Sequence, residues 1–186
     1  MILETRALSF SRGGRALLRD LDLRLQAGDV LRLLGPNGSG KTSLSQILSG
    51  HSRDHQGQVQ RGFQRHEVFL LPQGGGRDFE IPFQLREILS EKARRHPLLK
   101  NVPLNRLWNE ASGGERQKIL LTRALDEGAK LIILDEPSHH LDQRSRQDLE
   151  DILGRWNEIA PQSVLILIDH VLREDPRWQS LRLGDA

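Results

Sequence analysis

One short stretch of the chain spaces glycines, a lysine and a hydroxyl residue as phosphate binding requires. Gly35, Gly40, Lys41 and Thr42 fit the pattern Gly-x4-Gly-Lys-[Ser/Thr]. The glycines let several backbone N–H groups converge on one phosphate, the lysine adds positive charge at the β- and γ-phosphates, and the threonine hydroxyl can ligate Mg²⁺. The sequence therefore predicts a nucleoside triphosphate site. Its candidate binding residues are Gly35, Pro36, Asn37, Gly38, Ser39, Gly40, Lys41, Thr42 and Ser43.

Two carboxylates follow a second apolar run. The segment 131–134 is apolar without a break, which is typical of a strand buried on both faces, and Asp135 and Glu136 come next. Acidic groups at the carboxyl end of a strand lie where ligands bind in open α/β sheets, and beside a phosphate loop one of them normally holds Mg²⁺. We therefore expect Asp135 to be a metal ligand with Thr42, and Glu136 to orient or deprotonate the attacking water. The alternative is an ordinary strand followed by an acidic turn.

A third motif, Ser112-Gly113-Gly114-Glu115, has two interpretations. Serine followed three residues later by glutamate is a capping box, which is sufficient to begin the amphipathic helix that follows. The same backbone N–H groups and helix dipole could instead face a phosphate, as a second anion site. The residues alone favour the structural interpretation.

The elements that must position these residues alternate between strand and helix patterns. Val30–Leu34 predicts a strand that runs into the phosphate loop, Ser43–Leu48 predicts the opening of a helix, and Gly50 its end. Further strands are expected near 1–10, at 16–25, twice within 58–72, and at 130–134, 163–168 and 181–183, and further helices at 84–95, 102–108, 114–127 and 143–157. This order predicts an α/β core with a helical subdomain at about 75–120, preceded by a hinge at Gly74–Gly76.

The composition limits the class of protein. A length of 186 residues suggests one domain, and no apolar run approaches the roughly 20 residues that span a bilayer. The N-terminus lacks the basic-then-apolar layout of a signal peptide, and the absence of cysteine excludes disulfides, so a cytoplasmic setting is expected. The formal charge is only +2, with cations scattered along the chain, which is a weak case for nucleic-acid binding.

Together, these motifs resemble those of the nucleotide-binding subunit of an ABC transporter, over nearly the whole chain. Gly35–Thr42 is similar to the Walker A motif, and Leu131–Asp135 resembles Walker B, with Glu136 at the catalytic-base position. Ala111–Glu115 resembles the family signature, although the family usually begins it with leucine. The resemblance implies a P-loop NTPase (RecA-like) α/β core with an N-terminal antiparallel β subdomain and a small inserted α-helical subdomain, in one domain of residues 1–186.

Three more residues occupy family positions. Gln73 lies at the position of the Q-loop glutamine, Asp142 is the acidic residue of the D-loop, and His170 matches the switch histidine. The resemblance implies that Gln73 lies near the Mg²⁺ held by Thr42 and Asp135. It also implies that Glu136 polarises the water and that His170 contacts the γ-phosphate.

The family mechanism implies two ATP-binding chains that face head to tail. Each ATP then lies between one P-loop and the signature residues Ser112, Gly113 and Gly114 of a second copy or a homologous subunit. Charge neutralisation and positioning supply the catalysis. The implied ligands are ATP and Mg²⁺, and no nucleic acid is expected.

The segment after the Q-loop suggests which kind of ABC protein this is. Asp78–Phe83 and Leu85–Leu89 resemble the importer ATPases that serve metal, siderophore and cobalamin uptake. We therefore expect a subunit that drives transport through a polytopic membrane permease, peripheral on the inner face of the membrane. The alternative is a soluble, non-transport ATPase acting on ribosomes or nucleic acid, because 136–142 is similar to the matching segment of ABC translation factors. A cassette that binds ATP without hydrolysing it is a third possibility, which the intact Glu136 and His170 oppose.

Arg12 occupies the position at which the family usually stacks an aromatic residue on adenine, and the chain has no tyrosine. We hypothesise that its guanidinium plane stacks on the base, since arginine stacks well on π systems. The alternative is that Arg12 points to solvent. Replacement Arg12→Ala is expected to weaken ATP affinity in a nucleotide titration. An unchanged affinity would contradict stacking.

Overall fold

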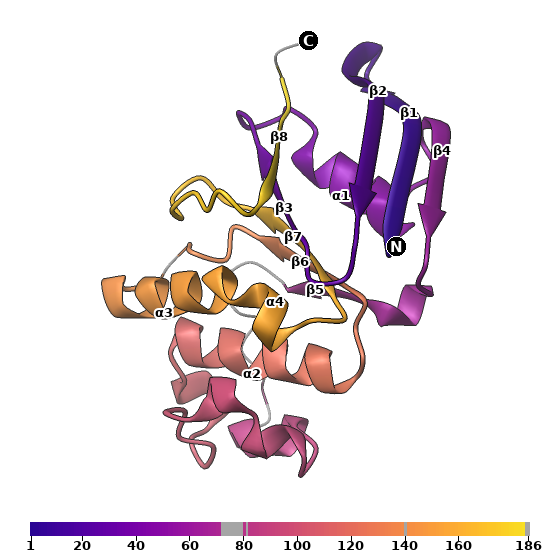
Figure 1. Cartoon of the computed structure of the whole chain (residues 1–186). Coiled ribbons are helices and arrows are strands. Elements are labelled where there is room, and N and C mark those ends of the chain that lie inside the picture. The colour runs from indigo at the N-terminus through magenta and orange to yellow at the C-terminus, as the bar shows by residue number, and fades with distance from the viewer. Residues whose placement is uncertain (72–79, 81, 140, 185–186) are drawn as a thin grey trace.

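A computed structural model of the chain describes residues 1–71, 80, 82–139 and 141–184. Its strands and helices form two sheets with helices against them (Figure 1). Strands β1 (Leu3–Arg12), β2 (Arg15–Leu25) and β4 (Gln56–Arg61) make an antiparallel sheet in the order β2-β1-β4. The predicted N-terminal antiparallel β subdomain is thereby confirmed.

The second sheet is parallel and has the order β5-β6-β7-β3-β8. Its strands are β3 (Val30–Leu34), β5 (Val68–Leu71), β6 (Leu131–Asp135), β7 (Val164–Ile168) and β8 (Gln179–Arg182). Each agrees with an expected strand to within two residues. The near-continuous apolar runs of β6 and β7 are explained by burial on both faces.

Alternating residues of this sheet face two different helical layers. Leu131 and Ile133 pack into the core shared with α1 (Lys41–Ser49) and the antiparallel sheet. Ile132 and Leu134 pack into the core shared with the helices on the opposite face. Those helices are α2 (Gly113–Asp126), α3 (Gln143–Gly154) and the short α4 (Trp156–Ile159) (Figure 1). The fold class is thus an α/β P-loop core, as expected.

The expected helices at 84–95 and 102–108 are wrong in their extent. In place of two helices, the region has short 3-10 turns at Leu85–Ile88, Ala93–Arg95, Pro97–Leu99 and Trp108–Glu110. A further 3-10 turn, Arg65–Glu67, precedes β5. The backbone N–H of Leu85 donates to the carbonyl of Arg106 at 3.0 Å, and that of Arg86 to Leu104 at 3.0 Å. The backbone at Leu89 is extended, with φ −115° and ψ 140°, so the first turn ends there and no continuous helix runs over 84–95.

A small core of its own stabilises this insert. Phe83 stacks on Trp108 with ring centroids 5.7 Å apart, and the Arg116 guanidinium lies 5.4 Å from the Trp108 ring. Buried Leu85, Leu89 and Ile119 belong to the same cluster, so the insert packs on α2. The predicted glycine hinge at 74–76 lies outside the described residues.

The expected helix over 143–157 is interrupted. Helix α3 ends at Gly154, whose carbonyl accepts a 2.6 Å hydrogen bond from Arg177, and Trp156 then begins α4. The Trp156 ring is 1% exposed, and its Nε1 donates to the carbonyl of Ser163 at 3.2 Å. Glycine favours a helix end at this point, and the break allows the Trp156 indole to lie buried beneath the sheet.

Candidate functional site

The P-loop connects the end of β3 to the start of α1, as predicted. Gly40 is the N-cap of α1 with φ 102°, and no side chain caps this end of the helix. Thr42 lies in the exposed first turn, next to the buried Lys41. An uncapped helix N-terminus presents N–H groups and a partial positive charge, which suits a phosphate.

Gly35 is held by a close approach of the C-terminal strand to the loop. Its φ is 135°, and a Cβ there would lie 2.3 Å from the carbonyl oxygen of Leu183 and 2.7 Å from the Ser39 hydroxyl. Only glycine fits this position. The buried Ser39 hydroxyl has no hydrogen-bond partner among the described residues, so the loop retains a donor that a phosphate oxygen can accept.

The Lys41 ammonium is folded back onto its own loop. Its Nζ donates to the carbonyl oxygens of Gly35 at 2.7 Å and Pro36 at 2.9 Å. The side chain is therefore already desolvated and oriented, and these carbonyls fix its position within the loop.

Asp135 is the last residue of β6, and Glu136 follows it at the same edge of the sheet. Burial raises the pKa of Asp135, and the nearby Glu136 charge raises it further. The Lys41 charge lowers this pKa, but the net direction is upward. Asp135 and Lys41 thus face a common region. Glu136 has the left-handed φ of 49°, and its N–H donates to the carbonyl of Ile168 at 2.7 Å. Such a conformation costs about 1–2 kcal/mol in a residue other than glycine, and it turns the chain sharply at the strand end.

A cavity of 560 Å³ joins the P-loop to the predicted switch histidine. Its lining residues are Arg32, Leu34, Gly35, Pro36, Asn37, His170, Glu174 and Arg182. The exposed His170 follows β7 at the same edge. The structure thus brings together the P-loop, Asp135, Glu136 and His170, which lie up to 135 residues apart (170 − 35) in the sequence.

The predicted signature residues lie elsewhere in the chain. Ser112 begins α2, on the opposite face of the parallel sheet from α1 (Figure 1). The capping box is formed: Ser112 Oγ accepts from the N–H of Glu115 at 3.2 Å, and the Glu115 carboxylate accepts from the N–H of Ser112 at 2.8 Å. A Cβ on Gly114 would lie 2.8 Å from the Ser145 side chain, so this glycine also permits the close approach of α2 and α3.

Three other predicted residues have different outcomes. Asp142 is the N-cap of α3, and the hydrogen bond from the Ser145 N–H, 2.7 Å long, lowers the pKa of its carboxyl. Arg12 is exposed at the end of β1, beside the hairpin turn. Gln73 lies outside the described residues.

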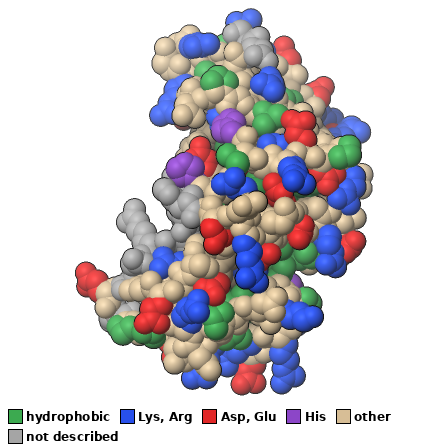
Figure 2. Space-filling view, turned by 90° about the vertical axis from the view of Figure 1, so that its left-hand side faces the viewer, with side chains coloured by type: hydrophobic (Ala, Val, Ile, Leu, Met, Phe, Trp, Pro, Cys, Tyr) green, Lys and Arg blue, Asp and Glu red, His purple; other side chains and the backbone are tan. Residues whose placement is uncertain are grey.

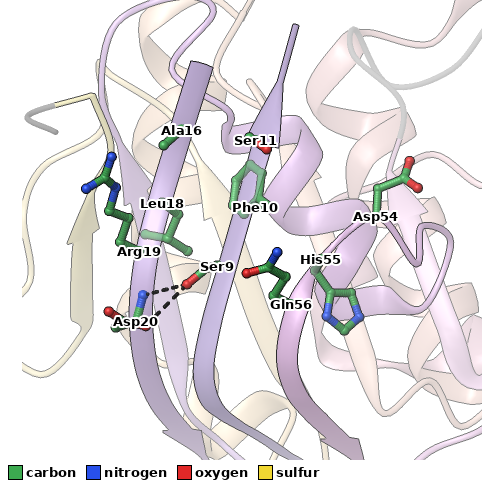
Figure 3. Close-up of a pocket in the computed structure, with 10 residues that line it drawn as sticks. All are labelled: Ser9, Phe10, Ser11, Ala16, Leu18, Arg19, Asp20, Asp54, His55 and Gln56. Atoms are coloured by element: carbon green, nitrogen blue, oxygen red, sulfur yellow. Dashed lines mark hydrogen bonds between the residues drawn. The ribbon is translucent and has the colours of Figure 1, made fainter. Parts of the chain in front are cut away.

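A second cavity, of 500 Å³, lies beside the antiparallel sheet and was not predicted (Figure 3). It is lined by Ser9, Phe10, Ser11, Ala16, Leu18, Arg19, Asp20, Asp54, His55 and Gln56. Phe10 links this cavity to the P-loop, because a Cβ on Gly40 would lie 3.2 Å from the Phe10 ring. Arg12 is not among its lining residues.

Sequence reasoning missed two buried polar residues that connect the site. Gln117 of α2 donates from its side-chain amide to the carbonyl of Pro137, directly after Glu136. Asp169, 1% exposed, accepts from the N–H of Ser138 at 3.1 Å. A polar residue at an apolar helix or strand position is the signal that could have found them, since such groups are buried only with partners.

Comparison with known proteins agrees with this geometry. Residues 18–139 match the family described as ABC transporter. The chain is 38% identical to the zinc import ATP-binding protein ZnuC of Alkalilimnicola ehrlichii, over 89% of this chain and 67% of that one. It is 34% identical to the taurine import ATP-binding protein TauB of Escherichia coli K12, over 84% and 69%. A Pyrococcus furiosus protein described as a putative ABC transporter ATP-binding protein has the same fold, with a TM-score of 0.76, 20% identity and coverage of 98% and 97%.

The raised pKa of Asp135 predicts a pH-dependent gain from Asp135→Asn. The folded state binds the proton more tightly than the unfolded state, so wild-type stability falls as pH rises through the window from the usual aspartate pKa to the raised one. The asparagine variant lacks this loss. Without nucleotide or Mg²⁺, its Tm should therefore exceed the wild-type value at pH 7, and the difference should shrink towards pH 4.

Thermal unfolding across this pH range tests the prediction. Asp54→Asn, at an exposed aspartate, is the matched control for removal of one carboxylate. A Tm for Asp135→Asn below that of the wild type at pH 7, or a difference independent of pH, would contradict the assigned cause.

Proposed function

The chain belongs to the ABC transporter family and is an ATPase, and we propose that its ATP hydrolysis drives solute uptake through a separate membrane subunit. The observation that carries this proposal is the meeting of the P-loop and His170 at one cavity, with Asp135 and Glu136 at the same sheet edge. Phosphoryl transfer to water needs such a cluster of donors, cations and carboxylates around one phosphate.

The P-loop is the proposed phosphate cradle. The N–H groups of Gly38 to Ser43 and the helix dipole of α1 bind the phosphates, and the Lys41 ammonium exchanges its loop carbonyls for phosphate oxygens. The Thr42 hydroxyl and Asp135 carboxylate would hold Mg²⁺, with Gln73 as a further ligand. Their hard oxygen atoms suit this ion, and Mg²⁺ would neutralise charge on the phosphates.

Glu136 and His170 are the proposed catalytic residues. Glu136 orients and deprotonates the attacking water, and its strained backbone fixes the carboxylate at the end of β6. His170 contacts the γ-phosphate from the other side of the cavity. Glu136 thus acts as a general base and His170 by position and charge, and neither forms a covalent bond to the phosphorus.

A second copy or a homologous subunit completes the proposed site. Within one chain, α2 and its Ser112–Gly114 turn lie across the parallel sheet from the P-loop helix α1. A head-to-tail dimer would place the signature of one chain against the ATP of the other, with Asp142 near the contact. ATP then closes the dimer, and this closure is the movement delivered to the membrane subunit.

Two features favour transport over action on ribosomes or nucleic acid. The relatives ZnuC and TauB are named for import, of zinc and of taurine, which supports a role in import without indicating one cargo. On the face shown in Figure 2, basic and acidic side chains are intermingled, whereas a nucleic-acid surface is typically one basic patch. In the described part of the chain, no helix combines the length and apolarity of a membrane span. The proposed location on the inner face of the membrane would come from binding to the permease.

Glu136→Gln should separate binding from turnover. The amide keeps the shape of the side chain but cannot accept the proton. We therefore expect ATP affinity within about threefold of the wild type and a fall in kcat of about 10²–10⁴-fold. Fluorescent-nucleotide titration and phosphate release measure the two quantities. Glu127→Gln, on the exposed end of α2, is the control that should keep full turnover. Hydrolysis at the wild-type rate in Glu136→Gln would remove Glu136 from the base role.

Isolation from native membranes tests the partner. A tagged chain extracted in mild detergent should co-purify with a protein of several membrane spans, and mass spectrometry identifies it. ATP turnover of that complex should respond to the transported solute. Recovery with ribosomes and without such a membrane protein would favour the non-transport alternative.

A further inference from the structure

Arg32 is a charged residue in the middle of the apolar strand β3. Arg32 is 3% exposed. Strand β3 lies between β7 and β8, which places Arg32 opposite Leu167 and Ser180. Leu31 and Leu33 face the core that contains α1, so alternation directs Arg32 to the other face. Burying a guanidinium costs free energy unless its N–H groups find partners, so the strand needs a reason to keep it.

The guanidinium binds the turn that carries His170. Nη2 donates to the carbonyl oxygens of Asp169 at 3.2 Å and Leu172 at 2.8 Å, and Nε lies 3.4 Å from the Asp169 carbonyl. These two carbonyls flank His170 and Val171. Nη1 is buried without a hydrogen-bond partner among the described residues. In this orientation the Arg32 guanidinium binds both carbonyls, while its Nη1 is left without a partner among the described residues.

The Asp169 side chain completes the turn from within. Its Oδ1 accepts from the N–H groups of Val171 at 2.7 Å and Leu172 at 3.0 Å, while Oδ2 accepts from Ser138 at 3.1 Å. The backbone around His170 is therefore held on both sides, by Arg32 through its carbonyls and by Asp169 through its N–H groups.

The position of Arg32 in the chain links this turn to the P-loop. Gly35 follows Arg32 by three residues, and Arg32, Gly35 and His170 all line the 560 Å³ cavity. Because β3 is a rigid strand between two neighbours, the hydrogen bonds from Arg32 fix the His170 turn relative to the loop. A buried apolar side chain would fill the same space without fixing the turn.

We propose that Arg32 is a positioning residue for ATP hydrolysis, acting through His170. It holds the turn 169–172 so that the imidazole stays at the mouth of the P-loop cavity. This inference rests on the proposed role of His170 at the γ-phosphate. Arg32 lines the cavity wall with its donors bound to the turn, and the proposed substrate contact belongs to His170.

A double-mutant cycle between Arg32→Met and His170→Ala tests the proposal. Methionine fills the space of the side chain without donors. In the purified full chain at saturating ATP and Mg²⁺, Arg32→Met should lower kcat about tenfold while the ATP dissociation constant changes less than about threefold. In the His170→Ala background, the same substitution should change kcat by less than about twofold, because the residue through which it acts is gone.

Arg61→Met is the matched control, since the Arg61 guanidinium likewise donates to two backbone carbonyls, those of Ile47 and Leu48 at the end of α1. It should lower Tm and leave kcat unchanged. If Arg32→Met does not fold, Arg32→Lys replaces it in the same cycle, because lysine keeps the charge but cannot bridge both carbonyls. Thermal unfolding identifies which variants are folded.

The outcomes separate this inference from the function it rests on. Wild-type kcat in His170→Ala would overturn the role of His170 and the inference with it. A strong loss in His170→Ala, with an equal loss from Arg32→Met in both backgrounds, would leave the ATPase site intact and overturn the inference alone. Wild-type kcat in a folded Arg32→Met variant would do the same.

Discussion

The site depends on one constraint, the register of three parallel strands. Ile168 of β7 lies opposite Leu33 of β3 on one side and Asp135 of β6 on the other, so the three strands end at one level. The P-loop, Glu136 and Asp169–His170 each begin within two residues of that level. Because parallel strands present their carboxyl ends at one edge, three distant segments meet there without a long loop. The 2.7 Å hydrogen bond from Glu136 to Ile168 continues this alignment into the first residue beyond the sheet.

The same sheet divides the chemistry between two layers. Side chains alternate along β6 and β7, so one core holds the P-loop helix α1 and the other holds α2 and α3. The phosphate loop and the Ser112 turn cannot approach each other within this arrangement, because the parallel sheet lies between their helices. Gln117 connects α2 to the turn after Glu136, since its side-chain amide donates to the carbonyl of Pro137. An ATP site that uses both the phosphate loop and the Ser112 turn, as proposed above, would therefore need a second chain.

Local patterns predicted most of the elements that hold the site. The apolar run of β6, the glycine at the end of α1 and the capping box of α2 act within a few residues of where they stand, and each was found in place. The helices expected within the insert were wrong in extent: the chain is extended at Leu89, and Leu85 and Arg86 pair with residues about twenty positions away, which no local pattern shows. Arg32 shows the same limit. A charge inside an apolar strand signals a partner, but that partner lies 137 residues along the chain and only the sheet brings it near.

Charge at the site is balanced for a ligand that carries both signs. Burial and Glu136 disfavour the ionised form of Asp135, whereas the Lys41 ammonium already has two carbonyl partners but no carboxylate bonded to it among the described residues. A cation beside Asp135 would favour the ionised form of its carboxylate. Phosphate oxygens would bind the Lys41 ammonium more strongly than neutral carbonyl oxygens do. A cation alone would stabilise only the Asp135 carboxylate, and a phosphate alone would bind only the Lys41 ammonium. A phosphate bound with its divalent cation corrects both, so the polypeptide accepts an electrostatic cost in its free state that this pair removes on binding.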